Sequence, residues 1–157
     1  MTETRITLDD IDRQLLSLLQ RDAQLSAVDL GTALNLSSSQ AARRKQRLET
    51  AGLISAYSAR LDAVRLGLSV QAFVQVELAR HGAEPAAAFA RLVRLQPEVV
   101  SAWTLTGNAD YLLRVYCADL TDLNRLIHQV LLAHPGVARV QSQIVLDQMK
   151  PDAPLPI

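Results

Sequence analysis

Cysteine, aromatic residues and long apolar runs are all scarce in this 157-residue chain. The single cysteine, Cys117, excludes an internal disulfide. Aromatic residues make up 4% of the chain, too few for a surface that stacks on unpaired bases, and this disfavours an RNA partner. No apolar run approaches the roughly 20 residues that a membrane helix needs, and residues 1–12 lack the apolar stretch of a secretory signal. We therefore expect a cytoplasmic protein without a membrane partner.

Residues that form catalytic or metal sites are also few. His81, His128 and His134 show no metal-ligand spacing with cysteine or acidic residues. Cys117 lies in an alternating apolar segment, which favours a buried thiol over a nucleophile or a ligand. The second half of the sequence has no paired carboxylates, no nucleophile with its base and no phosphate-binding glycine loop. The sequence predicts no metal, no cofactor and no enzymatic activity.

Positive charge is concentrated in one segment of an otherwise balanced chain. Overall, 16 Lys and Arg residues balance 16 Asp and Glu residues. Between Ser37 and Arg60, five positive side chains accompany a single negative one, Glu49. A local basic patch is typical of one binding surface for a polyanion, and here it predicts duplex DNA. The alternative interpretation is a solvated helix face that has no partner.

The same region has the pattern of a helix-turn-helix. A first helix with apolar residues at helical spacing begins near residue 8, with Thr7 as its expected N-cap. Ser26 is the expected N-cap of a short second helix, residues 35–37 make the turn, and a third helix covers residues 38–51. Gly52 follows, in the position that tolerates positive φ.

The third predicted helix carries groups that read base pairs. Ser39, Gln40 and Arg43 share one face near its start, where a recognition helix enters the major groove most deeply. Hydroxyl, amide and guanidinium groups match the donors and acceptors of base edges there. The basic residues after Arg43, together with Arg60, are expected to bind phosphates, although Lys45 falls on the inward stripe and its stem covers the core edge. The expected DNA-binding residues are Ser38, Ser39, Gln40, Arg43, Arg44, Lys45, Arg47 and Arg60.

After Gly52 the pattern becomes extended. We expect residues 55–67 to form a linker strand or a short wing. The expected domains are therefore a helix-turn-helix domain over residues 1–54, this linker, and a second domain over residues 68–157.

The second half alternates strand and helix patterns. Residues 70–78 are apolar at every second position, which predicts a half-buried strand. A helix with Pro85 in its first turn follows, then strands over residues 99–106 and 111–117, a helix capped by Asp119, and a last strand over residues 137–146. The order βαββαβ predicts a ferredoxin-like antiparallel sheet with both helices on one face. The expected fold class is α+β, with a winged helix-turn-helix joined to this sheet domain.

Such a sheet has one face that its own helices leave uncovered. Five large residues are too many to fit beneath two helices: Phe73, Trp103, Leu105, Leu112 and Tyr116. We expect the open face to pack against a second copy and form a homodimer.

Several motifs together resemble the Lrp/AsnC, or feast/famine, family of transcriptional regulators. The stretch of residues 8–16 is similar to the family's opening, and Leu36-Ser37 with Arg44, Arg47, Leu48-Glu49 and residues 52–54 is similar to its recognition helix. Residues 57–61 resemble its linker, Gly107-Asn108-Ala109-Asp110-Tyr111 its Gly-x-x-Asp-Tyr hairpin, and residues 135–137 the turn before its last strand. Two departures are Ala23-Gln24, where the family often has Gly-Arg, and Lys45, where many members have an apolar residue.

The resemblance implies a DNA-binding regulator that senses an amino acid or related metabolite, and dimers that associate into tetramers or octamers. The hairpin has its own logic, because free amide hydrogens near Gly107 and Asn108 meet a carboxylate while Asp110 holds an ammonium group. The alternative is that Asn108 and Asp110 only complete the turn. By resemblance, the last strand contributes from a neighbouring subunit. The expected effector residues are Gly107, Asn108, Asp110, Tyr111, Gln141 and Ser142.

Two other function classes stay open at this point. Dimeric ferredoxin-like sheets also occur in small enzymes, although the catalytic groups that such an enzyme needs are missing from the sequence. A non-specific architectural DNA-binding protein would use the same basic patch without reading sequence.

Overall fold

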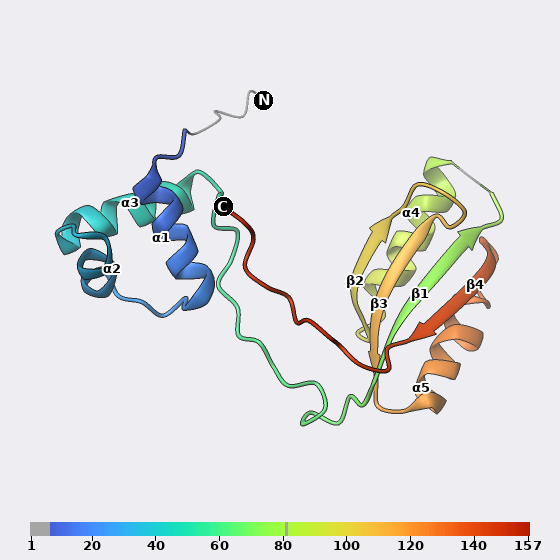
Figure 1. Cartoon of the computed structure of the whole chain (residues 1–157). Helices are drawn as coiled ribbons and strands as arrows, with labels where there is room; N and C mark the ends of the chain where they lie inside the picture. The colour runs from blue at the N-terminus through green and yellow to red at the C-terminus, as the bar shows by residue number, and fades with distance from the viewer. Residues whose placement is uncertain (1–6, 81) are drawn as a thin grey trace. The chain divides into compact units, whose positions relative to one another are not determined.

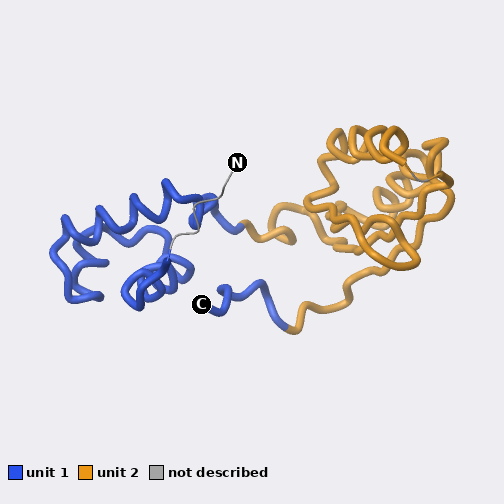
Figure 2. The backbone as a smooth tube through the Cα atoms, turned by 90° about the horizontal axis from the view of Figure 1, so that it is seen from above, with its two compact units in different colours: residues 1–60, 150–157 blue, residues 61–149 orange. Residues whose placement is uncertain are grey.

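The computed structural model describes residues 7–80 and 82–157, which divide into two compact units. One unit comprises Met1–Arg60 and Lys150–Ile157, and the other Leu61–Met149 (Figure 2). The sequence assigns residues 68–157 to the second domain. In the structure, the last eight of these residues, Lys150–Ile157, group with the helical unit. No helix in the described part of the chain is long and apolar enough to cross a membrane.

The first unit is built from α1 (Asp10–Arg21), α2 (Ala27–Leu34) and α3 (Ser38–Thr50) (Figure 1). Apolar residues from all three helices meet in one core. Its buried members are Leu15, Leu16, Leu19, Leu30, Leu34, Ala41 and Leu48.

The N-cap of α1 differs from the expectation. Asp9, and not Thr7, caps this helix, because its Oδ1 accepts a hydrogen bond from the Asp12 amide at 2.7 Å. The Asp12 carboxylate in turn accepts from the Asp9 amide at 3.2 Å. This reciprocal arrangement satisfies two amides at the helix start, which a cap at Thr7 does not do.

The turn between α2 and α3 is tight and depends on one glycine. Asn35 ends α2 in the left-handed conformation with φ 55°, and the Leu36 amide donates to the Gly31 carbonyl at 2.8 Å. A Cβ atom on Gly31 would lie 2.8 Å from the Leu36 carbonyl oxygen, which is closer than real Cβ contacts allow. The predicted N-cap Ser26 is confirmed, and Gly52 has the expected positive φ of 73°.

The expected linker strand does not form. Residues 53–62 have no regular structure, and residues 63–67 form a turn in which the Leu68 amide donates to the Ala63 carbonyl at 2.8 Å. A strand needs a neighbouring strand to satisfy its backbone groups, and the described part of the first unit contains only helices. The domain is therefore a three-helix unit without a wing in the described residues.

The second unit contains a four-stranded antiparallel sheet in the order β2-β3-β1-β4. Its elements are β1 (Val70–Leu78), α4 (Ala83–Arg94), β2 (Val99–Thr104), β3 (Tyr111–Cys117), α5 (Leu120–Arg125), η1 (Leu126–Leu131) and β4 (Val137–Ile144). The strand order is visible in Figure 1. The predicted βαββαβ arrangement is confirmed, and the last helix continues from α5 into the π-helical segment η1.

One face of the sheet forms the core of this unit with both helical segments. Alternate residues of β1 and β3 point to this face, and Phe89, Leu123, Leu126 and Leu131 of the helices pack on them. The buried strand residues are Ala72, Val74, Val76, Leu78, Leu113, Val115 and Cys117. Both helical segments therefore cover the same face, as the sequence predicts.

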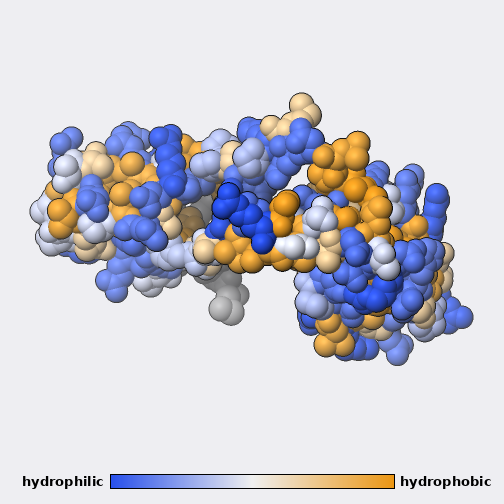
Figure 3. Space-filling view, turned by 90° about the horizontal axis from the view of Figure 1, so that it is seen from below, coloured by the Kyte–Doolittle hydropathy of each residue, from blue (hydrophilic) through white to orange (hydrophobic). Residues whose placement is uncertain are grey.

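The intervening residues occupy the opposite, open face of the sheet. Leu112 of β3 pairs with Trp103 of β2 and with Gln75 of β1, and Phe73 pairs with Arg114. Trp103 is 45% exposed. Exposed hydrophobic residues also lie in the segments after α3 and after β4, and Figure 3 shows hydrophobic side chains interspersed with hydrophilic ones on the molecular surface.

Candidate DNA interface and ligand cavity

The first turn of α3 is held by a capping box. The Ser37 hydroxyl accepts a hydrogen bond from the Gln40 amide at 3.2 Å, and the Gln40 carbonyl oxygen Oε1 accepts from the Ser37 amide at 3.0 Å. Gln40 therefore uses its acceptor inside the protein, and its Nε2 group remains as a donor for a partner. The Ser-x-x-Gln spacing is a known signature of this cap, and it was the available signal for this role of Gln40.

The outward face of α3 presents polar groups to solvent. Ser38, Ser39, Gln40, Arg43 and Gln46 are all exposed. Within residues 7–80 and 82–157, no hydrogen bond or ion pair engages the Arg43 guanidinium, so this group is available to a partner. The structure thus places the three residues expected nearest the bases, Ser39, Gln40 and Arg43, on one accessible surface, with Ser38 exposed beside them.

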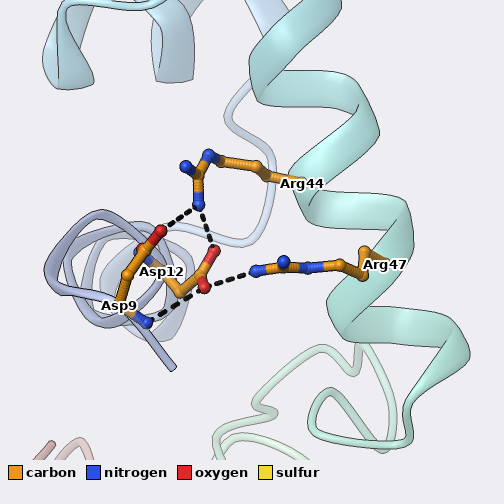
Figure 4. Close-up of polar contacts among 4 residues, drawn as sticks. All are labelled: Asp9, Asp12, Arg44 and Arg47. Atoms are coloured by element: carbon orange, nitrogen blue, oxygen red, sulfur yellow. Dashed lines mark hydrogen bonds and ion pairs between the residues drawn. The ribbon is translucent and has the colours of Figure 1, made fainter. Parts of the chain in front are cut away.

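Arg44 and Arg47, by contrast, turn toward the start of α1 (Figure 4). The Arg44 Nη1 atom lies 2.7 Å from Asp9 Oδ2 and 2.8 Å from Asp12 Oδ1. Arg47 Nη2 pairs with Asp12 Oδ2, and the Asp12 side chain is fully buried. A buried carboxylate needs such partners, because leaving it unpaired costs several kcal/mol, roughly 3–5 in measured cases. The two arginines therefore fasten α3 to α1.

This ion-pair cluster gives both arginines carboxylate partners that the sequence did not indicate. The Asp12 backbone amide, and then the Arg44 guanidinium, hold the pKa of Asp9 below its usual value, while Asp9 and then Asp12 raise the pKa of Arg44. The Arg44 side chain is 27% exposed and the Arg47 side chain 48% exposed. The sequence predicts phosphate contacts for both arginines, and in the structure each of them is already paired with a carboxylate.

The other two expected phosphate contacts also have partners within the helical unit. Lys45 Nζ lies 5.0 Å from the centroid of the Tyr57 ring. The Tyr57 hydroxyl donates to Glu49 Oε1 at 2.7 Å, and partial burial, with Glu49 beside it, raises the pKa of Tyr57 to about 12. Arg60 Nη1 donates to the Asp152 carbonyl at 2.8 Å. Tyr57 therefore holds the linker against α3, a role that sequence reasoning missed.

A cavity of about 270 Å³ lies on the open face of the sheet, beside the β2–β3 hairpin. Two cross-strand pairs between β1 and β4 contribute to it, Gln75 with Gln141 and Glu77 with Arg139. The complete lining is Gln75, Glu77, Asn108, Ala109, Arg139 and Gln141. The cavity thus combines one acidic group, one basic group and three side-chain amides.

Only two of the six expected effector residues, Asn108 and Gln141, line this cavity. The Asp110 carboxylate accepts a hydrogen bond from the Leu78 amide at 2.7 Å, so it ties the hairpin to the end of β1. Tyr111 packs on Phe89 with ring centroids 4.7 Å apart, on the core side. Ser142 pairs with the core-side residue Val74, and Gly107 is outside the lining.

Glu77 and Arg139 are the cavity residues that the sequence did not indicate. They lie more than sixty positions apart and become neighbours only through the register of β1 with β4. Within the described residues, no cluster of histidine, cysteine and acidic side chains has the arrangement of a metal site.

Comparison with known proteins places both units in one family. The AsnC-type helix-turn-helix domain matches residues 8–49, and the Lrp/AsnC ligand binding domain matches residues 71–155. The chain belongs to the Lrp/AsnC family of transcriptional regulators. The first match covers α1, α2 and all but the last residue of α3, and the second contains every residue that lines the sheet cavity.

Relatives across the Lrp/AsnC family match almost the whole chain. The DNA-binding transcriptional activator DecR of Escherichia coli is 37% identical over 150 residues, covering 96% of this chain and 99% of its own length. The leucine-responsive regulatory protein of Escherichia coli is 32% identical and covers 91% and 87%, respectively. A transcriptional regulator of Neisseria meningitidis, solved as a complex with L-Met, superposes with a TM-score of 0.91 at 37% identity, covering 96% of this chain and 97% of that one.

Proposed function

We propose that this Lrp/AsnC regulator reads a specific duplex DNA sequence with the first turns of α3. Arg43 carries the proposal, because its guanidinium is exposed and has no partner in the described part of the chain. Ser38, Ser39 and the Gln40 Nε2 group flank it on the same surface. A guanidinium fork and an amide at the start of a recognition helix suit the base edges of the major groove.

Phosphate binding falls mainly to Arg47 in this proposal. A guanidinium carries five N–H donors, and Asp12 engages the Nη2 end of Arg47 while almost half of the side chain is exposed. The remaining donors can reach a DNA phosphate without leaving Asp12 unpaired. Arg44, which bonds two carboxylates, is assigned to the fold rather than to DNA.

Selection from a random-sequence duplex pool, followed by affinity measurements, tests the DNA role. Arg43→Ala should weaken the selected duplex by about 1–3 kcal/mol and relax the preference at one position, while affinity for unrelated duplex changes little. Arg91→Ala, an exposed arginine of the other unit, is the matched control and should leave both affinities unchanged. Uniform binding of all duplexes by the unmodified chain would indicate an architectural protein instead.

We propose that the sheet cavity binds an amino acid as the effector. Arg139 would hold the carboxylate, Glu77 the ammonium group, and the amides of Gln75 and Gln141 would add hydrogen bonds. The solved complex of the Neisseria meningitidis relative with L-Met supports this ligand class. A volume of about 270 Å³ is close to the lower end of small-molecule sites, roughly 300 Å³.

Calorimetry with a panel of amino acids, including L-Met, tests the effector role. Glu77→Gln and Arg139→Gln remove one charge each and should each weaken binding at least tenfold. Ser142→Ala, on the other side of β4, is the control and should bind as the unmodified chain does. Unchanged binding by both charge variants would remove this cavity from consideration.

We also propose a homodimer that forms through the open sheet face and associates further into tetramers or octamers. Exposed Trp103, with Leu112 beside it, supports this interface. Apolar residues that lie outside both cores support further association, since each is at least 61% exposed: Leu61, Val64, Leu66, Leu146 and Met149.

A further inference from the structure

The C-terminal segment Lys150–Ile157 follows the sheet unit but groups with the helical unit (Figure 2). Gln20 of α1 binds it through both ends of its amide. Its Nε2 donates to the Leu155 carbonyl at 3.2 Å, and its Oε1 accepts from the Leu155 amide at 2.5 Å. Arg60 adds the bond to the Asp152 carbonyl. All three contacts use the backbone of the segment.

The sequence of this segment suits such docking. Pro151, Pro154 and Pro156 restrict the backbone, so less conformational entropy is lost when the segment is held extended. Leu155 lies between two prolines, and it therefore has the one amide hydrogen among residues 154–156. In an extended segment the N–H and C=O of one residue point the same way, and the Gln20 amide complements both.

The helix that binds the docked segment, α1, also contacts α3, which carries the proposed DNA-binding surface. The same helix that carries Gln20 begins at the capping box of Asp9 and Asp12. These two carboxylates hold Arg44 and Arg47 of α3. A displacement of α1 therefore acts on the ion pairs that position the recognition helix.

In the sequence, the docked segment comes shortly after β4, which carries the cavity residues Arg139 and Gln141. Immediately after β4, the Val145 amide donates to the Gln71 carbonyl at 2.9 Å. Residues 145–148 then line a second cavity, of about 390 Å³, together with linker residues 61–64. The chain between the ligand cavity and the docked segment is therefore short and partly bonded.

We propose that Lys150–Ile157 is a strap that docks on α1 through Gln20 and transmits the state of the sheet cavity to the recognition helix. The coupling part of this inference rests on the proposed function, whereas the docking part does not. The strap gives the effector domain a second connection to the helices besides the linker, covalent at β4 and hydrogen-bonded at Gln20 and Arg60.

Hydrogen exchange of the full-length chain tests docking without any ligand. The Leu155 amide should exchange at least tenfold more slowly than in a free peptide of residues 150–157. Gln20→Ala should remove this protection, and Gln20→Glu, which keeps an acceptor but loses the Nε2 donor, should reduce it less. Gln14→Ala, at an exposed position of the same helix, is the matched control and should leave it unchanged. Free-peptide exchange in the unmodified chain would overturn the docking.

A second arm of the same experiment tests coupling, with the duplex obtained by selection as the probe. DNA should alter exchange in residues 137–149 of the unmodified chain by at least threefold, because coupling between two sites is reciprocal. Gln20→Ala should bind the duplex but lose this distant change. An undiminished change in Gln20→Ala would refute coupling through the strap. Absence of DNA binding by the unmodified chain would refute the proposed function and leave the docking result intact.

Discussion

Asp12 of α1 joins this helix to the recognition helix α3. Its side chain is fully buried, yet it is bonded to Arg44, to Arg47 and to the Asp9 amide. Burial of a charge is tolerated only where such partners replace water. The basic character of α3 thus serves two purposes, since two of its cations hold the fold and Arg43 is left for a partner.

Removal of both cationic partners of Asp12 should make the helical unit easier to unfold. We expect the double variant Arg44→Met with Arg47→Met to lower the free energy of unfolding by about 3–5 kcal/mol, because it leaves a buried carboxylate unpaired. Adding Asp12→Leu should recover most of this loss, since well-packed apolar residues can replace a buried ion pair. Urea unfolding of the three proteins measures both effects. Equal stability of the double and triple variants would contradict the expected penalty.

Tyr57 should make the unfolding free energy depend on high pH. Its pKa is raised from 10.0 to about 12, chiefly by burial and then by the bond to Glu49, so the folded state favours the neutral phenol. The stabilisation is therefore complete below pH 10 and is lost as the pH rises through about 12. The tyrosinate absorbance of the unmodified chain, minus that of Tyr57→Phe, should rise near pH 12. A difference that already rises at pH 10 would show that Tyr57 does not dock on α3.

At the scale of elements, the turn between α2 and α3 fixes how the recognition helix leaves the core. Gly31 permits the Leu36 carbonyl to approach it closely, and the Leu36 amide bonds back to Gly31. Glycine ordinarily weakens a helix by about 1 kcal/mol relative to alanine. The close approach of the Leu36 carbonyl explains why α2 has a glycine at position 31.

Gly31→Ala should therefore destabilise the helical unit, against the usual preference. The new Cβ would lie 2.8 Å from the Leu36 carbonyl oxygen and 3.2 Å from the Ser38 amide nitrogen, and both are backbone atoms that cannot rotate away. We expect a loss of about 1–3 kcal/mol in the unfolding free energy. Ala33→Gly, at an exposed position of the same helix, should cost only about 1 kcal/mol. Thermal unfolding compares the two variants, and a stabilising effect of Gly31→Ala would contradict the contact.

Elements with a strong local signal were predictable from the sequence. Ser26 and Asp119 begin helices as expected, because a short polar side chain before an apolar stripe is itself the cause of the cap. The strand expected over residues 55–67 was wrong, because an extended pattern becomes a strand only where a partner strand exists.

Contacts between distant elements were not predictable in the same way. The ion pairs of Arg44 and Arg47 join residues more than thirty positions apart, and nothing in the spacing of α3 indicates them. Glu77 and Arg139 share a cavity because of the β1–β4 register, which a single sequence does not specify. The exposure of Arg43 was predictable, because the helical period alone indicates which residues lie on the outward face of a helix.

At the scale of the whole molecule, the open sheet face is the surface that we propose for a second copy. Along β1 and β3, every second residue lies in the core, and the residues between them lie on this face. Trp103 and Leu112 lie side by side on it. A stable interface buries about 800 Å² on each partner.

Charges on this face should therefore dissociate the proposed homodimer. In a two-fold interface every substitution occurs twice, so Trp103→Lys with Leu112→Lys would bring four ammonium groups into one apolar contact. We expect light scattering at micromolar concentration to give at least the dimer mass for the unmodified chain and the monomer mass for this variant. Leu95→Lys, at a position after α4 that is 76% exposed, is the control and should remain associated. A monomeric unmodified chain would refute the interface, and a variant that keeps the dimer mass would move it to another surface.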